Sequence, residues 1–262
     1  MEIVCIGNEL LIGKTVNTNA TWLANRITCL GGEVKTIITV GDELEEIRRG
    51  LDYALNRKPD LIITTGGLGP TFDDKTLEGV AYAMGRPLEI NQDALNMVRR
   101  KYEAYYKEGR MEKVEITAAR RKMAILPSGS KPLYNPVGTA PGVALESNKT
   151  RIVILPGVPA EMKAIFDESV APLIRERGEK RFYEREIHVD GIMESTIAPL
   201  IDEVMRESPG VYIKSHPKGE ERKPHLDIHF STNADNEEEA EKKLESAIKK
   251  LRELVDREKD NR

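Results

Sequence analysis

The chain has 262 residues, of which 39% are hydrophobic and 32% are charged, and its formal net charge at pH 7 is −4. This length admits one large domain or two ordinary ones, and the negative charge gives no electrostatic support for a nucleic-acid partner. The two cysteines, Cys5 and Cys29, are too few for a disulfide framework or for a zinc site built from cysteine alone. The sequence shows neither a membrane-length apolar run nor a basic leader, so we expect a cytoplasmic protein that does not bind membranes.

The N-terminal part of the chain alternates β-branched runs with segments of helical periodicity. In chain order we predict a strand at Ile3–Ile6, a helix at Asn19–Leu30, a strand at Val34–Val40, a helix within 41–60 and a strand at 61–65. The second helix opens in a capping-box pattern, with Asp42 three residues before Glu45, and Pro59 closes the segment. This order predicts a parallel sheet with helices on its faces.

The middle of the chain continues with helices and then becomes rich in Pro, Gly and Ser. We predict helices at Lys75–Met84, Asn91–Lys107 and Val114–Arg121, an irregular stretch at 126–142, strands at Val143–Glu146 and Arg151–Leu155, and a helix within 156–174. The charged stretch at 175–183 marks a domain boundary. We therefore predict an α/β fold with a mostly parallel sheet and helices on both faces at residues 1–175, followed by a small α+β domain at 176–262.

In the small domain we predict the order β-α-β-β-α. The predicted elements are strands at Glu186–Val189, Val211–Ser215 and Leu226–Ser231, helices at Glu194–Arg206 and Glu237–Arg257, and a polar hairpin at 218–224. The last helix carries an apolar stripe, made of Ala240, Leu244, Ile248, Leu251 and Leu254. Because three short strands bury little surface, we expect this domain to need a partner, and we predict a homo-oligomer, in its simplest form a dimer.

The segment GNELLIGKT at residues 7–15 ends like a phosphate-binding P-loop but does not match one. A P-loop places four residues between its two glycines, whereas five separate Gly7 from Gly13. ATPase chemistry of that kind is therefore not predicted. Asn8 and Glu9 follow the first strand, so we expect them at the carboxyl edge of the sheet, where ligands bind in open α/β folds.

The segment TTGGLGPTFDDKT at residues 64–76 combines a glycine-rich turn with two adjacent carboxylates, Asp73 and Asp74. Glycines between a strand and a helix permit either a sharp turn or a close approach of backbone N–H groups to an anion. One aspartate is explained as a helix cap, with Asp74 well placed before Lys75. A divalent cation between a carboxylate and a phosphate explains the other, since Mg²⁺ is commonly held by one or two carboxylates plus substrate phosphates.

TTGGLGPTFDDKT resembles the signature of the molybdopterin-binding domain superfamily, and more specifically of the CinA family of competence/damage-inducible proteins. The resemblance extends over residues 6–27, 40–43, 135–142 and 155–162, and weakly over 191–203. It implies a molybdopterin-binding-like fold and metal-dependent hydrolysis of nucleotide diphosphates such as ADP-ribose. Many members of the family carry a further C-terminal amidohydrolase domain, and the sequence ends soon after its charged helix, so deamidation is not expected.

The expected small-molecule partner is a nucleotide or a pterin, and two other functions stay open. One is a module that binds or adenylylates molybdopterin in molybdenum cofactor metabolism. The other is a non-catalytic interaction protein. For the hydrolase we expect a divalent metal of the Mg, Mn or Co type, held by Asp73 and Asp74.

The predicted site collects residues from several loops of one sheet edge. Asp73, Asp74 and Glu161 are the candidate catalytic residues. For Glu161 we favour an ordinary carboxylate stabilised by the dipole at a helix start; the alternative is a second metal ligand or a base for water. The candidate substrate- and phosphate-binding residues are Asn8, Glu9, Asn19, Thr65, Gly66, Gly67, Gly69, Thr71, Thr76, Asn135, Gly138 and Gly157.

The histidines all fall in the small domain. His225, Asp227 and His229 alternate along one predicted strand and so share a face. A metal site is one interpretation, but we favour a solvated strand face, because short motifs of this kind are weak signals.

Overall fold

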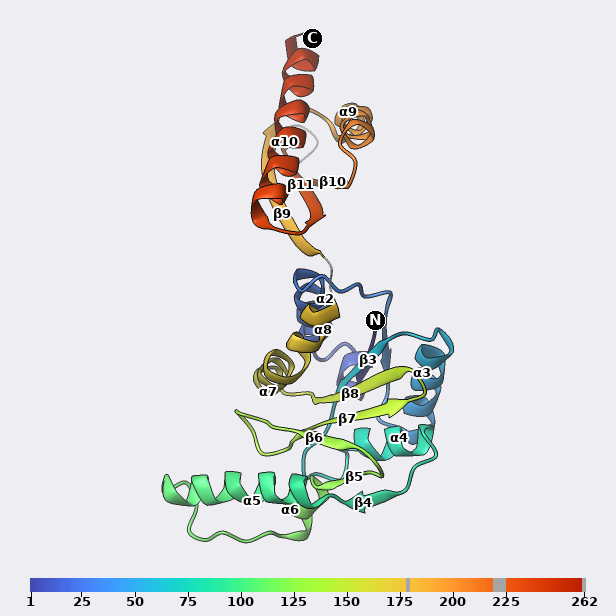
Figure 1. Cartoon of the computed structure of the whole chain (residues 1–262), viewed down its shortest axis with the longest axis vertical. Coiled ribbons are helices and arrows are strands. Elements are labelled where there is room, and N and C mark those ends of the chain that lie inside the picture. The colour runs from blue at the N-terminus through green and yellow to red at the C-terminus, as the bar shows by residue number, and fades with distance from the viewer. Residues whose placement is uncertain (178–179, 219–224, 261–262) are drawn as a thin grey trace. The chain divides into compact units, whose positions relative to one another are not determined.

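The computed structural model describes residues 1–177, 180–218 and 225–260. These residues form two compact units (Figure 1). The large unit comprises Met1–Ile27 and Gly32–Glu176, and the small unit comprises Arg177–Arg262 together with Thr28–Gly31. Each unit is built around its own sheet and is described separately.

A six-stranded sheet in the order β2-β1-β3-β8-β7-β6 forms the centre of the large unit. Its strands are β1 (Glu2–Ile6), β2 (Thr36–Val40), β3 (Leu61–Gly66), β8 (Thr150–Pro156), β7 (Gly142–Ser147) and β6 (Lys131–Leu133). The first four in sheet order are parallel, and β7 and β6 continue the sheet in antiparallel pairing. The predicted α/β class with a mostly parallel sheet is therefore confirmed.

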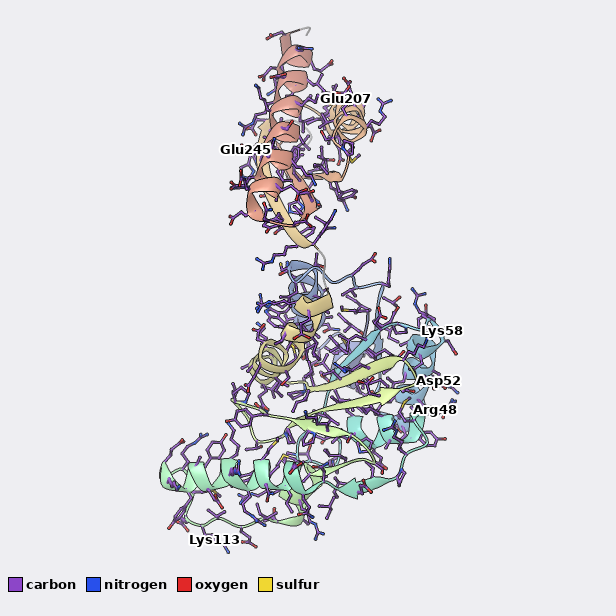
Figure 2. The ribbon with its side chains drawn as sticks, in the orientation of Figure 1. Arg48, Asp52, Lys58, Lys113, Glu207 and Glu245 are labelled. Carbon is purple, nitrogen blue, oxygen red and sulfur yellow. The ribbon has the colours of Figure 1, made fainter. Side chains whose placement is uncertain are left out.

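Helices pack around this sheet. Apolar residues at helical spacing give a helix one apolar face, and that face is buried against the sheet. They are α1 (Asn8–Leu11), α2 (Thr18–Cys29), α3 (Leu44–Asn56), α4 (Thr76–Ala83), α5 (Gln92–Lys107), α6 (Ala118–Lys122), α7 (Pro159–Ile165), the π-helical turn η1 (Phe166–Val170) and α8 (Ala171–Arg177). In α3, Ile47 and Leu51 are fully buried, while Arg48 on the outer face pairs with Asp52 (Figure 2). On α2, the ring of Trp22 packs edge-to-face on Phe166, with centroids 5.4 Å apart.

Several local predictions in the large unit are wrong. Thr117 caps α6, so the helix predicted at 114–121 begins at Ala118 instead. The irregular stretch contains β6 and part of β5 (Ile125–Pro127), which pairs with β4 (Leu88–Ile90). The predicted helix within 156–174 is interrupted by the wider turn of η1.

Neither aspartate proposed as a helix cap has that role. The residue before α3 is Glu43, which makes no side-chain cap, and the Asp42 carboxylate instead accepts the backbone N–H of Asn8. The residue before α4 is Lys75, again without a side-chain cap, and the Asp74 carboxylate accepts the N–H of Thr71. Both carboxylates are therefore used in tertiary or loop contacts.

The small unit has a three-stranded antiparallel sheet in the order β10-β11-β9, with two helices. Its elements are β9 (Arg181–Asp190), α9 (Glu194–Glu207), β10 (Val211–Pro217), β11 (His225–Ala234) and α10 (Glu237–Asp260). The hairpin predicted at 218–224 lies outside the described residues, apart from Lys218.

The apolar stripe of α10 packs inside its own unit. Leu244 and Leu251 are at most 1% exposed and belong to one core with Ile228 and Phe230 of β11. The sheet and α9 of the same unit cover the stripe, so the stripe does not support the expectation that this domain needs a partner. The dimer stays a prediction, without this argument.

Across the parts of the chain that the structure describes, we find no helix with both the length and the apolar character needed to cross a bilayer.

Candidate functional site

A cleft of about 420 Å³ lies where the parallel strands of the large unit end. The segments that follow β1, β2, β3 and β8 all contribute lining residues, which is the expected ligand position in an open α/β sheet. Eight of the predicted site residues line it: Glu9, Gly66, Gly67, Gly69, Asp73, Asp74, Gly157 and Glu161. A smaller hollow of about 110 Å³ shares Glu9 and Gly157 and is also lined by Asn19 and Thr65.

The remaining predicted site residues support the walls rather than form them. Asn8, Thr71, Thr76, Asn135 and Gly138 are not among the residues that line either hollow. Each of the five contacts a residue that lines the cleft: Asn8 contacts Asp42, Thr71 contacts Asp74, Thr76 contacts Gly67, and Asn135 and Gly138 contact Glu161.

The glycine loop folds around the side chain of Asp74. A Cβ on Gly67 would lie 2.5 Å from Asp74 Oδ1, and one on Gly69 would lie 2.7 Å from Asp74 Oδ2. The backbone N–H of Thr71 donates to Asp74 Oδ2 over 2.8 Å. Glycine is therefore required at 67 and 69 because a carboxylate occupies the space of their side chains.

Asp73 and Asp74 share one hydroxyl. Thr71 Oγ1 lies 2.5 Å from Asp73 Oδ1 and 2.5 Å from Asp74 Oδ2. A hydroxyl has one proton, so it can donate to only one of the two carboxylates at a time. The hydrogen bond from Thr71, and then the Asp73 backbone amide, lower the pKa of Asp73, so this exposed carboxylate is ionised at neutral pH.

Lys122 holds the same loop from outside the cleft. Its ammonium group donates to the backbone carbonyl of Thr71 and, over 2.9 Å, to that of Asp74. Sequence reasoning missed Lys122, which ends the short basic run of α6 and carries no motif.

Glu161 is held by Asn135, whose side chain is 3% exposed. The Asn135 amide donates to Glu161 Oε2 over 2.7 Å and to the Ala140 carbonyl over 2.8 Å. Its oxygen accepts the N–H of Val137 and of Gly138, at 3.0 and 2.8 Å. A Cβ on Gly138 would collide with the Glu161 carboxylate. Asn135 and Gly138 are thus positioning residues for Glu161.

Asn19 and Thr65 join β3, β8 and α2 at the smaller hollow. Asn19 Nδ2 donates to Thr65 Oγ1 and to the carbonyl of Gly157, at 3.2 and 2.8 Å, and Thr65 donates to the carbonyl of Pro156. Asn19 Oδ1 and Thr76 Oγ1 are buried and have no hydrogen-bond partner among the described residues. Since buried polar atoms are normally satisfied, Asn19 Oδ1 is an acceptor left without its usual partner beside the smaller hollow.

Asp42 is a charged lining residue that the sequence analysis did not place in the site. It exchanges contacts with Asn8, accepting the Asn8 N–H over 2.9 Å while its own N–H points at Asn8 Oδ1. The sequence analysis interpreted Asp42 as part of a capping box. A local spacing pattern carries no information about a partner 34 residues away, such as Asn8.

The cleft is negative throughout. Five carboxylate residues line it, Glu9, Asp42, Asp73, Asp74 and Glu161, and its described lining contains no Lys, Arg or His. A phosphate would meet strong repulsion there unless a cation accompanied it. Within the described residues the cleft carboxylates do not form a group of three converging ligands, whereas Mg²⁺ bound with a phosphate needs only one or two carboxylates from the protein.

A family model described as "Probable molybdopterin binding domain" matches residues 2–176. The chain belongs to this family. A protein of Caldivirga maquilingensis is 48% identical over 251 residues, covering 95% of this chain and 94% of its own. A protein of Aeropyrum pernix is 46% identical over 256 residues, covering 97% of this chain and 92% of its own.

Among solved structures, a CinA protein of unknown function from Thermoplasma acidophilum is similar, with 42% identity and a TM-score of 0.58. The match covers 64% of this chain and 93% of that one. The resemblance to CinA and to molybdopterin-binding domains that the glycine loop indicated is therefore confirmed.

Proposed function

We propose that the cleft binds a nucleotide diphosphate together with a divalent metal ion of the Mg, Mn or Co type, and hydrolyses it, with ADP-ribose as the type substrate. The observation that supports this is the lining of the cleft, which has five carboxylates and no cationic side chain at a glycine-rich loop. A carboxylate-only lining suits a phosphate ligand when a metal ion comes with it. The family supplies the expectation of a nucleotide- or pterin-type ligand.

Asp73 and Asp74 would hold the metal, because they already face one another across the Thr71 hydroxyl. When bound, the ion would neutralise phosphate charge and polarise the reacting phosphate. Asn19 Oδ1 would accept a hydrogen bond from a donor group on the ligand. The amides of the glycine loop are proposed to donate to phosphate oxygens, as the loop position after β3 allows.

Glu161 is proposed as the base, oriented by Asn135. A water oxygen would bond to one phosphorus of the diphosphate as the bond from that phosphorus to the bridging oxygen breaks. Glu161 would take the proton of the water. With ADP-ribose the products are AMP and ribose 5-phosphate, and no oxidant or reductant is needed.

The second candidate is an adenylylating or pterin-binding module, favoured by the description of the family model. Adenylylation attacks the same kind of phosphorus, with a phosphate of the pterin as nucleophile in place of water. The same cleft residues would serve both reactions. The identity of the nucleophile, rather than the metal or the glycine loop, separates them.

The test is incubation of the purified protein with ADP-ribose and Mg²⁺, Mn²⁺ or Co²⁺, with AMP measured by chromatography. We expect AMP with at least one metal and none after chelation with EDTA. A parallel reaction with ATP and a pterin phosphate tests the second candidate through pyrophosphate release. Binding of both ligands without turnover of either would contradict both enzymatic functions and favour the non-catalytic interaction protein.

A further inference from the structure

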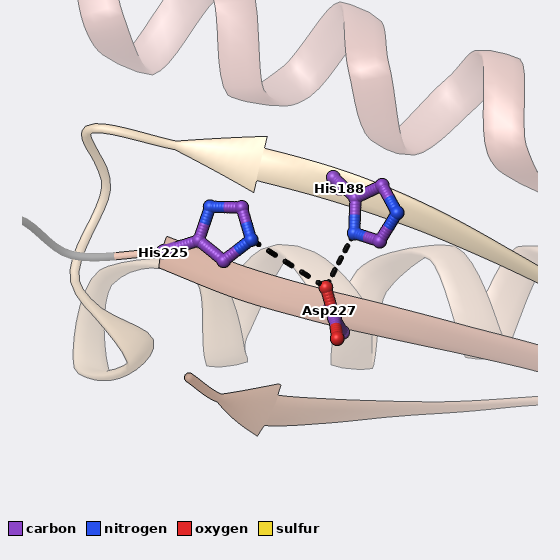
Figure 3. Close-up of side chains that lie close together, drawn as sticks. All are labelled: His188, His225 and Asp227. Atoms are coloured by element: carbon purple, nitrogen blue, oxygen red, sulfur yellow. Dashed lines mark hydrogen bonds and ion pairs between the residues drawn. The ribbon is translucent and has the colours of Figure 1, made fainter. Parts of the chain in front are cut away.

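A second cluster of ligand-type side chains lies on the sheet of the small unit. One donor atom each from His188, His225 and Asp227 falls within 4.8 Å of the others (Figure 3). His188 comes from β9, and the other two come from β11. In the figure both imidazole rings point at the same oxygen of Asp227.

The pairing of β9 with β11 creates the cluster. Asp227 lies directly opposite His188, and His225 lies opposite Asp190, in antiparallel register. Because side chains alternate along a strand, these four residues emerge on one face, and the apolar residues between them, Val189 and Leu226, enter the core on the other. The site is therefore set by backbone pairing.

The hydrogen bonds of His225 leave a position that a cation would fill. His225 Nδ1 bonds Asp190 Oδ1, and its Nε2 lies 3.7 Å from Asp227 Oδ1. A neutral imidazole donates from one nitrogen only, so a ring that gives its Nδ1 proton to Asp190 turns the lone pair of Nε2 toward a carboxylate oxygen. That arrangement is repulsive unless a proton or a metal ion lies there.

Asp227 is placed to ligate without losing its other contact. Its side chain is 3% exposed, and its second oxygen, Oδ2, is 2.5 Å from Lys218 Nζ. Oδ1, which faces both rings, remains on the side of the cluster. His188 and His225 are 61% and 39% exposed, so an ion can reach the cluster from solvent.

The donor set and its support match a zinc-type site. Imidazole nitrogen and carboxylate oxygen suit zinc, nickel, cobalt and copper, and a carboxylate on the distal nitrogen of a ligating histidine is the usual way to orient that ring. Ligand atoms around a tetrahedral zinc ion lie about 3.4 Å apart for bonds of about 2.1 Å. The 3.7 Å between His225 Nε2 and Asp227 Oδ1 needs little adjustment to reach that spacing, whereas His188 Nδ1 and Asp227 Oδ1 are directly hydrogen-bonded and must move apart to admit the ion.

We propose that His188, His225 and Asp227 bind one divalent transition-metal ion of the zinc type, with Asp190 orienting His225. Three protein ligands leave a fourth position for water or for a ligand atom from another molecule. The site is separate from the cleft of the large unit in sequence, in donor chemistry and in the metal class it prefers. It does not depend on the proposed hydrolase function.

The test is titration of the EDTA-treated full-length protein with Zn²⁺ by calorimetry, and with Co²⁺ by visible absorption. The double variant Asp73→Ala/Asp74→Ala removes the proposed metal ligands of the cleft, and we expect it to keep one zinc equivalent. His188→Ala and His225→Ala are expected to lose that equivalent and the tetrahedral Co²⁺ spectrum. Asp190→Asn is expected to weaken zinc binding about 10- to 100-fold.

His229→Gln is the matched control, because His229 shares the strand and the face but pairs with Glu184. It should bind zinc like the parent protein. Circular dichroism identifies any variant that fails to fold, and the exposed His188 provides a change that spares the core. The proposal is overturned if the parent binds no zinc at micromolar concentration, or if His188→Ala/His225→Ala binds it with unchanged affinity.

Discussion

At the scale of single residues, the hydroxyl of Thr71 and the carboxylates around it carry most of the cleft's chemistry. Asp74 accepts the Thr71 N–H, and its carboxylate lies against Gly67 and Gly69. Asp73 is exposed and makes fewer contacts. The lowered pKa of Asp73 follows from its hydrogen bond with Thr71. Two carboxylates that compete for one proton donor are a good place for a cation.

Asp73→Ala and Asp74→Asn are predicted to lower metal-dependent turnover of ADP-ribose by more than about 100-fold, the upper end for loss of a partner outside the ligand sphere. Asparagine at 74 keeps an acceptor for the Thr71 N–H, so the loop should survive. The measurement is AMP release against metal concentration, with thermal unfolding as the check on folding. Turnover at the parent rate in both variants would show that the metal is not bound there.

Gly138→Ala is predicted to reduce kcat/KM by about 100-fold, because a methyl group would displace the Glu161 carboxylate and small misplacements of a reacting group are costly. Steady-state kinetics with ADP-ribose measure the effect. Val137→Ala is the matched control, since that side chain is exposed in the same loop and only its backbone contacts Asn135. Equal rates for the two variants would remove Glu161 from the mechanism.

At the scale of elements, segments with a continuous periodicity were predicted well, and segments without one were predicted poorly or only in part, as with β9, whose predicted range covered residues 186–189 of 181–190. α2 and β3 were predicted within a residue at each end, because their periodicities are continuous. α1 has only four residues and makes no side-chain cap, so no local pattern marks it. β6 contains Pro132, a residue type that argues against a strand. β6 is nevertheless the edge strand of the sheet, where proline is tolerated.

The candidate site shows the same division between local and distant information. The glycine loop and the 155–162 segment were found because each carries its chemistry in adjacent residues. Asp42 and Lys122 were missed because their roles depend on partners 34 and about 50 positions away, Asn8 and the Thr71 loop. Only the fold brings those segments together. The sequence therefore predicted that the site lies at the carboxyl edge of the sheet, but it did not predict all of the residues that line the cleft.

Leu251→Ala in α10 is predicted to cost about 2–5 kcal/mol of unfolding free energy, the range for truncating a fully buried leucine. The side chain is 0% exposed within the core of the small unit. Glu253→Ala, on the exposed face of the same helix, should change stability by less than about 0.5 kcal/mol. Urea unfolding measures both. A cost that disappears on dilution would mean that Leu251 packs against another chain instead.

At the scale of the whole molecule, two units carry two kinds of candidate ligand site. The large unit offers hard carboxylate oxygens beside a glycine loop, which suits an ion delivered with phosphates. The small unit offers imidazoles and one buried carboxylate, which suits a zinc-type ion. Differing metal preferences in one titration would therefore assign each ion to its unit, without any assumption about how the units are arranged.

Exposed apolar side chains on the large unit are the remaining argument for the predicted homo-oligomer. Leu11, Ile12 and Val16, within residues 11–16, are 56%, 74% and 80% exposed, and neighbouring exposed apolar side chains commonly mark contact surfaces. We predict a dimer formed through this segment, with two-fold symmetry as the commonest arrangement. Ile12→Glu/Val16→Glu should dissociate it, while the matched change Tyr212→Glu, at an exposed apolar residue of the small unit, should not. Light scattering at micromolar concentration decides the question, because a parent mass near the 29.4 kDa of one chain would contradict the dimer.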